Sequence, residues 1–418
     1  MDILSPRTTG DIQCDAWVET PVFFISRWDT TNPYQFHQDA LNTFLVYSLL
    51  NLNPDEIQPV LLDARARDGP FTLAWSHIFS SSHHLVDIRQ LANSSSHAGQ
   101  MLCFRRAVWG VHGGISALSM DGKNSISERN GSHISVLMNA FREFMMDRIR
   151  RSVFGERGWD QRWLPLRVPE SYAVPIERLV WSRLDAIKKG VDKSALEREV
   201  VARTGRVIVI TYAVRGTGTK LVPESVLLEA QIQGVLESDS QPEPMKHKAT
   251  KESRLSRTIK NDLQVMFSIQ RASRRWSEWG VLWNADLRGM EVQFRAVDFG
   301  SLSFVDQVAI SSSTDFFIGT HGAHFAHLLY LRRNPVAGVL ELQPPERSKG
   351  NHQFENLSLR MGHVYGRVRY GRKDVNRLGE VVGGAQHFVS AEEVTEMERI
   401  VYNILNSIAT RRMCEESK

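Results

Sequence analysis

The chain lacks the features that would place it in a membrane, in a disulfide-rich scaffold or on nucleic acid. No apolar run approaches the roughly 18 residues that a membrane-spanning helix needs. The 3 cysteines are too few for a disulfide framework or a zinc site. The net charge of +4 is small for 418 residues, so the composition does not demand a nucleic-acid partner.

A targeting segment is also missing from the start of the sequence. The first 13 residues have neither the basic start nor the apolar stretch of a signal peptide. We therefore expect either a cytosolic chain or a targeting segment that lies outside this sequence. One disulfide, between Cys14 and Cys103, is compatible with the sequence, and unpaired thiols are the alternative.

What the chain does contain is typical of a soluble globular protein, with 42% hydrophobic and 23% charged residues. Strand-like and helix-like segments alternate along it. Strands are predicted at residues 22–25, 58–63, 85–88, 101–111, 206–214, 291–298, 316–318 and 337–342. Helices are predicted at residues 39–52, 73–79, 133–154, 261–269, 304–310 and 323–331. This alternation predicts an α/β protein with parallel sheets and helical crossovers.

A chain of 418 residues is too long for one ordinary core, so two domains are expected. We predict a first Rossmann-like domain over residues 14–185 and a second over residues 200–385. Residues 238–253 are polar and without periodicity, and they indicate a mobile insertion in the second domain. A helix over residues 390–411 begins with a capping box and carries one apolar face, which predicts that it packs back onto the body.

The most informative segment is residues 314–331. An apolar strand meets two glycines, Gly319 and Gly322, with His321 between them, and a helix-like run begins at Ala323. This order places the first helical N–H groups where they can bind a phosphate, and the helix dipole attracts an anion. The glycines permit close approach of a ligand to the backbone. We predict a phosphate site at these four residues, with a helix-capping histidine as the alternative for His321.

This segment resembles the signature of glycosyltransferase family 61, a D-x-x-I-G-x-H-G-A-G-L-x-H-L-L-F-L run. The resemblance extends to residues 304–307, to residues 21–42 and to residues 102–107. Among family members, the chain most resembles those that add O-linked N-acetylglucosamine to EGF-like domains. It is also similar to plant β-1,2-xylosyltransferases. The resemblance implies a GT-B fold, with two facing Rossmann-like domains and a UDP-sugar bound to the C-terminal one.

The resemblance also implies roles in holding the nucleotide-sugar. Arg215 ends a strong strand, where ligands of parallel sheets bind, and a plain surface arginine is the alternative. Arg257 matches a second arginine of the family, with Arg254 as its possible substitute. Glu341 resembles the acidic residue of the family's V-x-E-L run and is expected to hold the ribose hydroxyls. His327 also matches a family histidine, and burial within the fold is at least as good an account of it.

In the first half, Asp39 is the candidate base that takes the proton of the acceptor hydroxyl. It is expected at the start of a helix, where a carboxylate is also favoured by the dipole alone, and the two accounts stay open. His37 is a rival for the base and Asp29 a weaker one.

Three positions depart from the family pattern. His324 replaces a glycine close to the phosphates, and Gln35 replaces a histidine. Residues 81–83 stand where some members have an acidic triplet, so no metal site is indicated and no cofactor is expected to be required. A changed donor or lost activity would be consistent with these departures.

The expected function is an inverting transfer of N-acetylglucosamine from UDP-N-acetylglucosamine to a protein Ser or Thr hydroxyl. UDP-xylose is the competing donor, and a nucleotide-sugar binder without catalysis is the alternative from another class. A Rossmann oxidoreductase is disfavoured because no G-x-G-x-x-G follows an early strand. The expected partners are a UDP-sugar and a protein or glycoprotein acceptor, with no nucleic acid and with a membrane only through an anchor outside this sequence.

By resemblance, the expected compartment is the lumen of the endoplasmic reticulum or Golgi. Three N-x-S/T sequons, at Asn93, Asn130 and Asn356, are compatible with this compartment.

Overall fold

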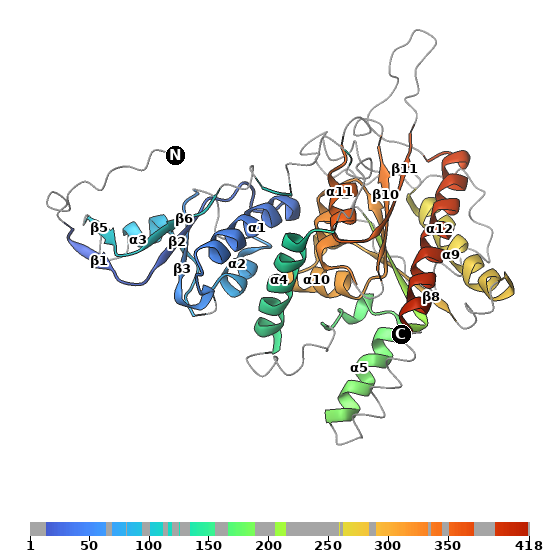
Figure 1. Ribbon diagram of the computed structural model, residues 1–418, viewed down its shortest axis with the longest axis horizontal. Coiled ribbons are helices and arrows are strands. Elements are labelled where there is room, and N and C mark those ends of the chain that lie inside the picture. Colours follow the sequence, from blue (N-terminus) through green and yellow to red (C-terminus); the bar gives the residue numbers. More distant parts are fainter. Residues whose placement is uncertain are drawn as a thin grey trace, which may run out of the picture. The chain divides into compact units, whose positions relative to one another are not determined.

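The computed structural model divides the chain into two compact units, which we describe separately (Figure 1). One unit contains Met1–Lys123 and Ser135–Leu164, and the other contains Asn124–Ile134 and Pro165–Lys418. The described residues are 14–63, 69–80, 82–93, 101–111, 116–118, 125, 134–154, 166–188, 205–214, 259, 262–283, 290–332, 336–344, 351–371 and 389–416. Within these ranges, none of the helices combines the length and the apolar character that crossing a membrane requires.

The first unit is built on a four-stranded parallel sheet in the order β4-β3-β2-β6. Its strands are β2 (Val22–Ile25), β3 (Gln58–Leu61), β4 (Val86–Asp87) and β6 (Ala107–Trp109). Its helices are α1 (Pro33–Leu49), α2 (Thr72–Ile78), α3 (Ile88–Asn93) and α4 (Val136–Phe154), with a short 3-10 helix η1 (Pro54–Glu56). The predicted alternation of strands and helices is confirmed here.

Helix α1 begins before its predicted start at residue 39. The side chain of Asn32 accepts the backbone N–H groups of Tyr34 and Gln35, at 3.0 and 3.4 Å. Pro33 occupies the first helical position, where its missing N–H costs nothing. The cap and the proline together set the start of the helix.

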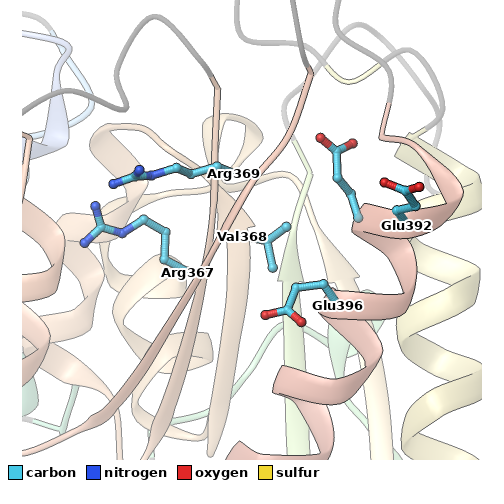
Figure 2. A pocket seen from close by; sticks show the side chains of 6 residues that line it. Arg367, Val368, Arg369, Glu392 and Glu396 are labelled. Carbon is cyan, nitrogen blue, oxygen red and sulfur yellow. The ribbon is translucent and has the colours of Figure 1, made fainter.

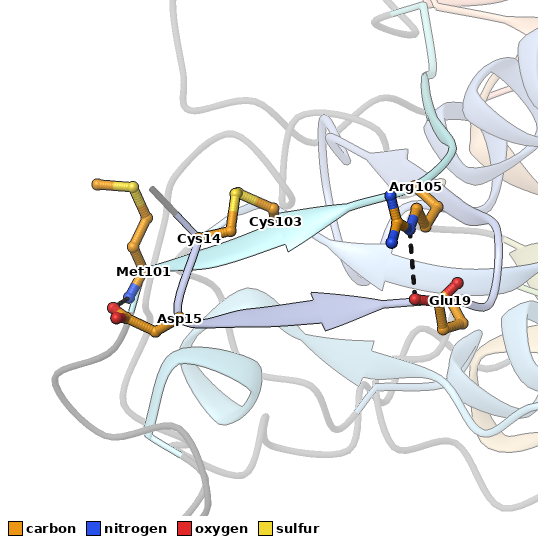
Figure 3. Close-up of a disulfide and its surroundings, with 6 residues drawn as sticks. All are labelled: Cys14, Asp15, Glu19, Met101, Cys103 and Arg105. Atoms are coloured by element: carbon orange, nitrogen blue, oxygen red, sulfur yellow. Dashed lines mark hydrogen bonds and ion pairs between the residues drawn. A yellow bond between two sulfur atoms is a disulfide. The ribbon is translucent and has the colours of Figure 1, made fainter. Parts of the chain in front are cut away.

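A smaller parallel sheet pairs β1 (Ala16–Val18) with β5 (Leu102–Phe104). The Cys14–Cys103 disulfide lies beside this pair, with its Cα atoms 5.8 Å apart (Figure 3). Of the two alternatives for these cysteines, the disulfide is therefore the one present.

Residues 101–111 form two strands rather than the one predicted. β5 pairs with β1, whereas β6 pairs with β2 of the larger sheet. The chain crosses between the sheets at Arg105 and Arg106, whose backbone groups bond to Val18 O and to the N–H of Val22. Each half of the run is thus held by a different partner strand.

The second unit is built on a five-stranded parallel sheet in the order β11-β10-β9-β7-β8. Its strands are β7 (Val207–Ala213), β8 (Glu291–Val297), β9 (Phe316–Thr320), β10 (Gly338–Gln343) and β11 (Val364–Arg369). The first four correspond to predicted strands. β11 was not predicted, because two arginines and a glycine interrupt its apolar pattern.

Helices flank both faces of this sheet. They are α5 (Pro175–Lys188), α9 (Asp262–Trp283), α10 (Phe304–Ser312), α11 (Gln353–Arg360) and α12 (Ala391–Glu416), with 3-10 helices η4 (Glu170–Tyr172), η7 (Phe299–Ser301) and η8 (Ala323–Tyr330). α9 and α12 lie side by side on one face, and α10 and α11 lie on the other (Figure 1). The second unit is therefore a doubly wound α/β layer structure.

The predicted C-terminal helix corresponds to α12 and packs back as expected. Its capping box is present, because Ser390 Oγ accepts the N–H of Glu393 while Glu393 Oε2 accepts the N–H of Ser390. A Cβ atom on Gly338 of β10 would overlap Ile404 of α12. The glycine thus allows the helix to approach the sheet closely.

The boundary between the units lies earlier than predicted. The sequence predicts a first domain over residues 14–185, but α5 belongs to the second unit. Arg295 Nη1 lies 2.7 Å from Glu177 Oε1 of α5, and both side chains are buried. Arg295 Nε also donates to Thr211 Oγ1 at 2.9 Å. Buried charges need partners, so this pair anchors α5 on the second sheet.

We expect loss of the disulfide to destabilise the first unit. It links residues separated by 89 positions, and such cross-links stabilise by about 2–4 kcal/mol, chiefly through the unfolded state. Cys14→Ser/Cys103→Ser should lower the free energy of unfolding in urea by that amount. Cys414→Ser is the matched control, since Cys414 is exposed and outside the disulfide. Equal stability of the wild type and the double variant would contradict the expectation.

Candidate functional site

In the second sheet, the connections leave the neighbouring strands β7 and β9 in opposite directions. From β7 the chain passes to β8 on one side, and β9 lies on the other side of β7. Ligands of doubly wound sheets bind outside the carboxyl ends of the strands at such a switch point. The register places Ala213 opposite Gly319 there. The ends of β7 and β9, with the turn after β9, therefore form the candidate site.

The predicted strand, glycine turn and helix follow one another in this turn. β9 ends at Thr320, His321 and Gly322 form the turn, and η8 begins at Ala323. No side chain caps η8, and the first backbone N–H groups of a helix have no partner within it. Ala323 is half-buried, and its N–H group, at the first residue of η8, is a candidate to bind an anion.

Residues 323–330 form the predicted helix, which is of the 3-10 type. Phe325 and Leu328, which align in a 3-10 helix, are both fully buried. A short apolar run that is buried on every side has no polar face to reveal a period of 3.6 residues. The sequence therefore does not separate the two helix types, and the predicted anion site relies on the N–H groups of this turn more than on a long helix dipole.

His321 lies in a buried hydrogen-bond network at the end of β9. Its Nδ1 bonds to Oε1 of Glu341 on β10, and its backbone N–H donates to Leu342 O at 2.8 Å. Its Nε2 lies 3.3 Å from Nδ2 of Asn351. Only 8% of the side chain is exposed.

The neighbours of the His321 ring assign its tautomer. Asn351 Oδ1 accepts the N–H of Gln353 at 3.2 Å, so the Asn351 amide group donates to Nε2 of His321. Nδ1 then carries the proton that is donated to Glu341. The ring orients the turn from inside. A direct contact between the ring and a phosphate stays a prediction, and it would require Asn351 to move.

Glu341 is occupied by partners within the fold. Its Oε1 bonds to His321 and its Oε2 accepts the hydroxyl of Tyr365, and 2% of the residue is exposed. Burial, and after it the Glu341 carboxylate, raise the pKa of Tyr365 well above its ordinary value, so Tyr365 remains a donor. The contact of Glu341 with ribose hydroxyls stays a prediction, and here the carboxylate organises the end of β10.

A second group of polar side chains beside this network was not predicted. Glu355 of α11 bonds to Arg367 of β11, to His352 Nδ1 at 2.7 Å and to Ser125 Oγ at 2.5 Å. Gln343 Nε2 donates to the backbone oxygen of residue 351 at 3.3 Å. Except for Ser125, these residues lie between positions 343 and 367, but they share no motif, so no sequence pattern predicts them.

Thr320 is a further polar residue at the end of β9 that sequence reasoning missed. It is 4% exposed, and its hydroxyl makes no hydrogen bond within the part of the chain that the structure describes. Buried hydroxyls are usually bonded, and leaving one unsatisfied costs about 1–3 kcal/mol. A ligand at this strand end would offer the missing partner.

Gly319 leaves space above the strand as predicted, but a side chain fills that space. A Cβ atom on Gly319 would lie 2.7 Å from Nε2 of His324. His327, farther along η8, is fully buried and stacks on Phe299 with ring centroids 5.2 Å apart. Burial within the fold therefore accounts for His327.

Residues 304–307, the Phe-Val-Asp-Gln run that also resembles the family, have a structural role. Asp306 lies in the first turn of α10, where its N–H donates to the cap residue Ser303 at 3.2 Å. Gln307 Nε2 donates to the backbone oxygens of Phe299 and Leu302, at 2.9 and 3.0 Å. These bonds hold the connection from β8 into α10.

The two candidate bases lie on α1 of the first unit. Asp39 does not stand at the start of its helix as predicted, because α1 begins at Pro33. Its carboxylate is 2% exposed, and its Oδ2 accepts the N–H of Trp28 at 3.0 Å. It therefore holds the loop that follows β2, near the carboxyl end of that strand.

His37 is fully buried, and its Nδ1–H donates to the backbone oxygen of Pro33 at 2.5 Å. Burial lowers the pKa of His37 to about 4, and the hydrogen bond to Pro33 offsets part of this effect. The imidazole is therefore neutral near pH 7, and it exposes no surface to a substrate.

Several predicted residues lie outside the described residues, namely Arg215, Arg254, Arg257 and the insertion at 238–253. Their roles stay predictions. In the described part of the chain, no three His, Cys, Asp or Glu side chains converge as metal ligands do.

A cavity of about 510 Å³ lies between β11 and the start of α12 (Figure 2). It is lined by Arg367, Val368, Arg369, Glu392, Glu393 and Glu396. The arginines and the glutamates lie on opposite sides of it (Figure 2). Charges of both signs do not favour a diphosphate, and Glu393 is already used in the capping box. We therefore place the candidate site at the switch point.

One comparison with known proteins bears on this geometry. The family model for Glycosyltransferase 61 matches residues 219–340, a segment that includes β8, β9 and the His321 turn. This match identifies the chain as a glycosyltransferase, and over residues 219–340 it is similar to family 61. None of the curated proteins matches it. A glycosyltransferase needs a sugar donor and a glycoconjugate acceptor, and the matched segment contains the turn at which an anionic donor would bind.

For this glycosyltransferase we expect stability to fall in mild acid because of His37. Its pKa drops on folding from 6.5 to about 4, so the unfolded state binds more protons between these values. The free energy of unfolding should therefore fall by roughly 3 kcal/mol as the pH is lowered through this window.

Urea titrations at pH 7 and pH 4.5 would measure this loss. His37→Asn is the matched variant, because its amide can still donate to Pro33 but does not titrate. The expectation fails if both proteins lose the same stability between the two pH values.

Proposed function

We propose that this protein is an inverting glycosyltransferase that moves N-acetylglucosamine from UDP-N-acetylglucosamine to a Ser or Thr hydroxyl of a protein. The acceptor oxygen bonds to the anomeric carbon from the side opposite the diphosphate. The bond from that carbon to the diphosphate breaks, a base takes the hydroxyl proton, and UDP leaves. The protein must stabilise the charge on the diphosphate and keep water from the reacting carbon.

The observation that supports this proposal most strongly is the coincidence of three features at one strand end. The switch point of the second sheet, the uncapped turn before Ala323 and the segment matched by the family all meet at the end of β9. Topology and sequence family point to the same position for independent reasons. They favour a GT-B-like arrangement in which the second unit binds the nucleotide.

In this proposal the diphosphate lies against the turn. The backbone N–H groups at Gly322 and Ala323 bind its oxygens, beside the space above Gly319 that the His324 ring fills. Arg215 and Arg257 supply positive charge, because the sequence offers no aspartate pair at residues 81–83 for a metal. His321 and Glu341 belong to the same subsite, and their mutual hydrogen bond holds the turn in shape.

Asp39 is the proposed general base. His37 is the weaker candidate because its ring is buried and its nitrogen donates to Pro33. Asp39 lies at the carboxyl end of β2, which is the usual position for ligands of a parallel sheet. One oxygen is held by Trp28, so the proposal requires the carboxylate to become accessible when the acceptor binds.

Two alternatives follow from the departures at His324 and Gln35. The enzyme could transfer xylose from UDP-xylose to a glycan, or it could bind a nucleotide-sugar without catalysis. In the amide orientation that satisfies its neighbours, Gln35 accepts the indole N–H of Trp28 at 2.9 Å. Gln35, which replaces a family histidine, therefore bonds to the side chain of Trp28, the residue whose backbone N–H is bound by Asp39.

A secretory compartment is supported by the Cys14–Cys103 disulfide, since such bonds persist in oxidising environments. The sequons give less support than the sequence alone indicates. Asn356 is 2% exposed on α11, so a glycan cannot be attached to it in the folded protein. We propose the lumen of the endoplasmic reticulum or Golgi on the first observation.

Turnover with a panel of donors would test the function. Purified protein is incubated with UDP-N-acetylglucosamine or UDP-xylose and with EGF-like domains or N-glycans, and UDP release and acceptor mass are measured. We expect UDP release with an added mass of one N-acetylhexosamine on the protein acceptor. A pentose on the glycan would favour the xylose alternative, and UDP binding without release would favour the inactive binder.

The position of the diphosphate can be tested by a charge at the turn. Ala323→Asp places a carboxylate at the first residue of η8, where it suits the helix N-terminus but repels an anion. We expect the dissociation constant for UDP to rise at least about tenfold, which corresponds to about 1.4 kcal/mol. Calorimetric titration with UDP measures this, and Ala323→Ser is the uncharged control. Unchanged affinity in the aspartate variant would move the diphosphate away from this turn.

A further inference from the structure

The imidazole of His324 occupies the switch point of the second sheet. A Cβ atom built on Gly319 would lie 2.7 Å from Nε2 of His324 and 3.2 Å from the Cβ of Ala213. Ala213 and Gly319 are register partners on β7 and β9. The position of a Cβ atom on Gly319 is therefore close both to the end of β7, at Ala213, and to the His324 ring. The ring lies over the crevice where a ligand of this sheet is expected.

Packing holds the ring in this position. The His324 ring lies 6.0 Å from the ring of Phe317 and 4.9 Å from that of Phe325, centroid to centroid. Nε2 is the atom turned toward Gly319. The residue as a whole is half-buried. The side chain is therefore oriented by its neighbours, with Nε2 buried against the end of β9 and part of the residue exposed.

The positions of Gly319 and His324 in the chain favour a His324 ring that lies over the end of β9. Gly319 has no side chain, and a Cβ atom at that position would collide with the ring. His324 is the second residue of η8, so its ring reaches back from the helix start over the end of β9. The family pattern has a glycine where this chain has His324. The imidazole is thus an addition that the space above Gly319 accommodates.

We propose that His324 is a diphosphate-binding residue of this enzyme. Its ring adds a side-chain N–H donor to the backbone donors at Gly322 and Ala323. Hydrogen bonds to an ionised phosphate are shorter and stronger than neutral ones. The inference rests on the proposed function, since it assumes that the site takes a nucleoside diphosphate.

Two other accounts of the ring make different predictions. If the imidazole is a plug, it competes with the ligand, and removing it should strengthen binding. If it is only an aromatic filler between Phe317 and Phe325, replacing it with another ring should change nothing. His324→Phe separates the three accounts, because it keeps the ring and removes the N–H donor.

The experiment is a calorimetric titration of wild type and His324→Phe with UDP and with uridine. We expect the variant to bind UDP about tenfold to a hundredfold more weakly, the range for a lost hydrogen bond to a charged group. Uridine has no phosphate, so its affinity should be the same in both proteins. His324→Gln keeps an N–H donor of similar reach and should recover part of the affinity for UDP.

Each remaining outcome overturns the inference. Equal UDP affinity in wild type and His324→Phe makes the ring a filler, and tighter binding makes it a plug. An equal loss for UDP and uridine assigns a structural role. If His324→Phe does not fold, as judged by thermal unfolding, His324→Leu is titrated with the same two ligands. A wild type that binds no nucleoside diphosphate defeats the proposed function itself, which is distinct from failure of the His324 variants alone.

Discussion

The site depends on one constraint, the parallel pairing of β9 between β7 and β10. Because β9 is hydrogen-bonded on both sides, its register is set, and a single row of residues crosses the sheet. Ala213, Gly319, Glu341 and Arg367 are consecutive partners in this row. The two small residues leave space at the ends of β7 and β9 that the His324 ring fills, and the charged residues that follow face a polar network. The turn after β9 therefore has the His324 ring on one side and the polar network on the other.

Buried charges hold the opposite, amino ends of the same strands. Asp315, directly before β9, lies 2.6 Å from Arg412 of α12 and accepts the N–H of Val209 at 2.8 Å. Arg412 also donates to Val207 O at 2.5 Å. Such charges persist in a core only when they are paired and hydrogen-bonded. Within this unit the amino ends are thus closed by internal partners, while at the carboxyl end the hydroxyl of Thr320 makes no bond among the described residues. A ligand that binds at the carboxyl ends of the strands needs polar groups there without internal partners, and this difference between the two ends of the sheet provides one.

Much of the fold could be predicted because buried parallel strands are continuous apolar runs, as at Val207–Ala213. The remaining differences have identifiable physical causes. The start of α1 was misplaced because Asn32 and Pro33 set it, ahead of the apolar pattern. The helix at η8 was predicted without its 3-10 type because a run buried on every side has no diagnostic period. Residues 175–185 were included in the first domain because the anchor of that segment, Glu177 with Arg295, joins residues far apart in the chain.

The amino-acid sequence by itself determined the alternation of strands and helices and the glycine-flanked turn at His321. Those features depend on residues that are neighbours in the sequence, so they can be predicted from the sequence alone. Only the tertiary structure decided which way the histidines face. The ring of His321 turns inward because Glu341 and Asn351 meet it there, and the ring of His324 lies over Gly319 because β7 and β9 end side by side. Side-chain direction depends on partners brought together from distant parts of the chain, and no local pattern records them.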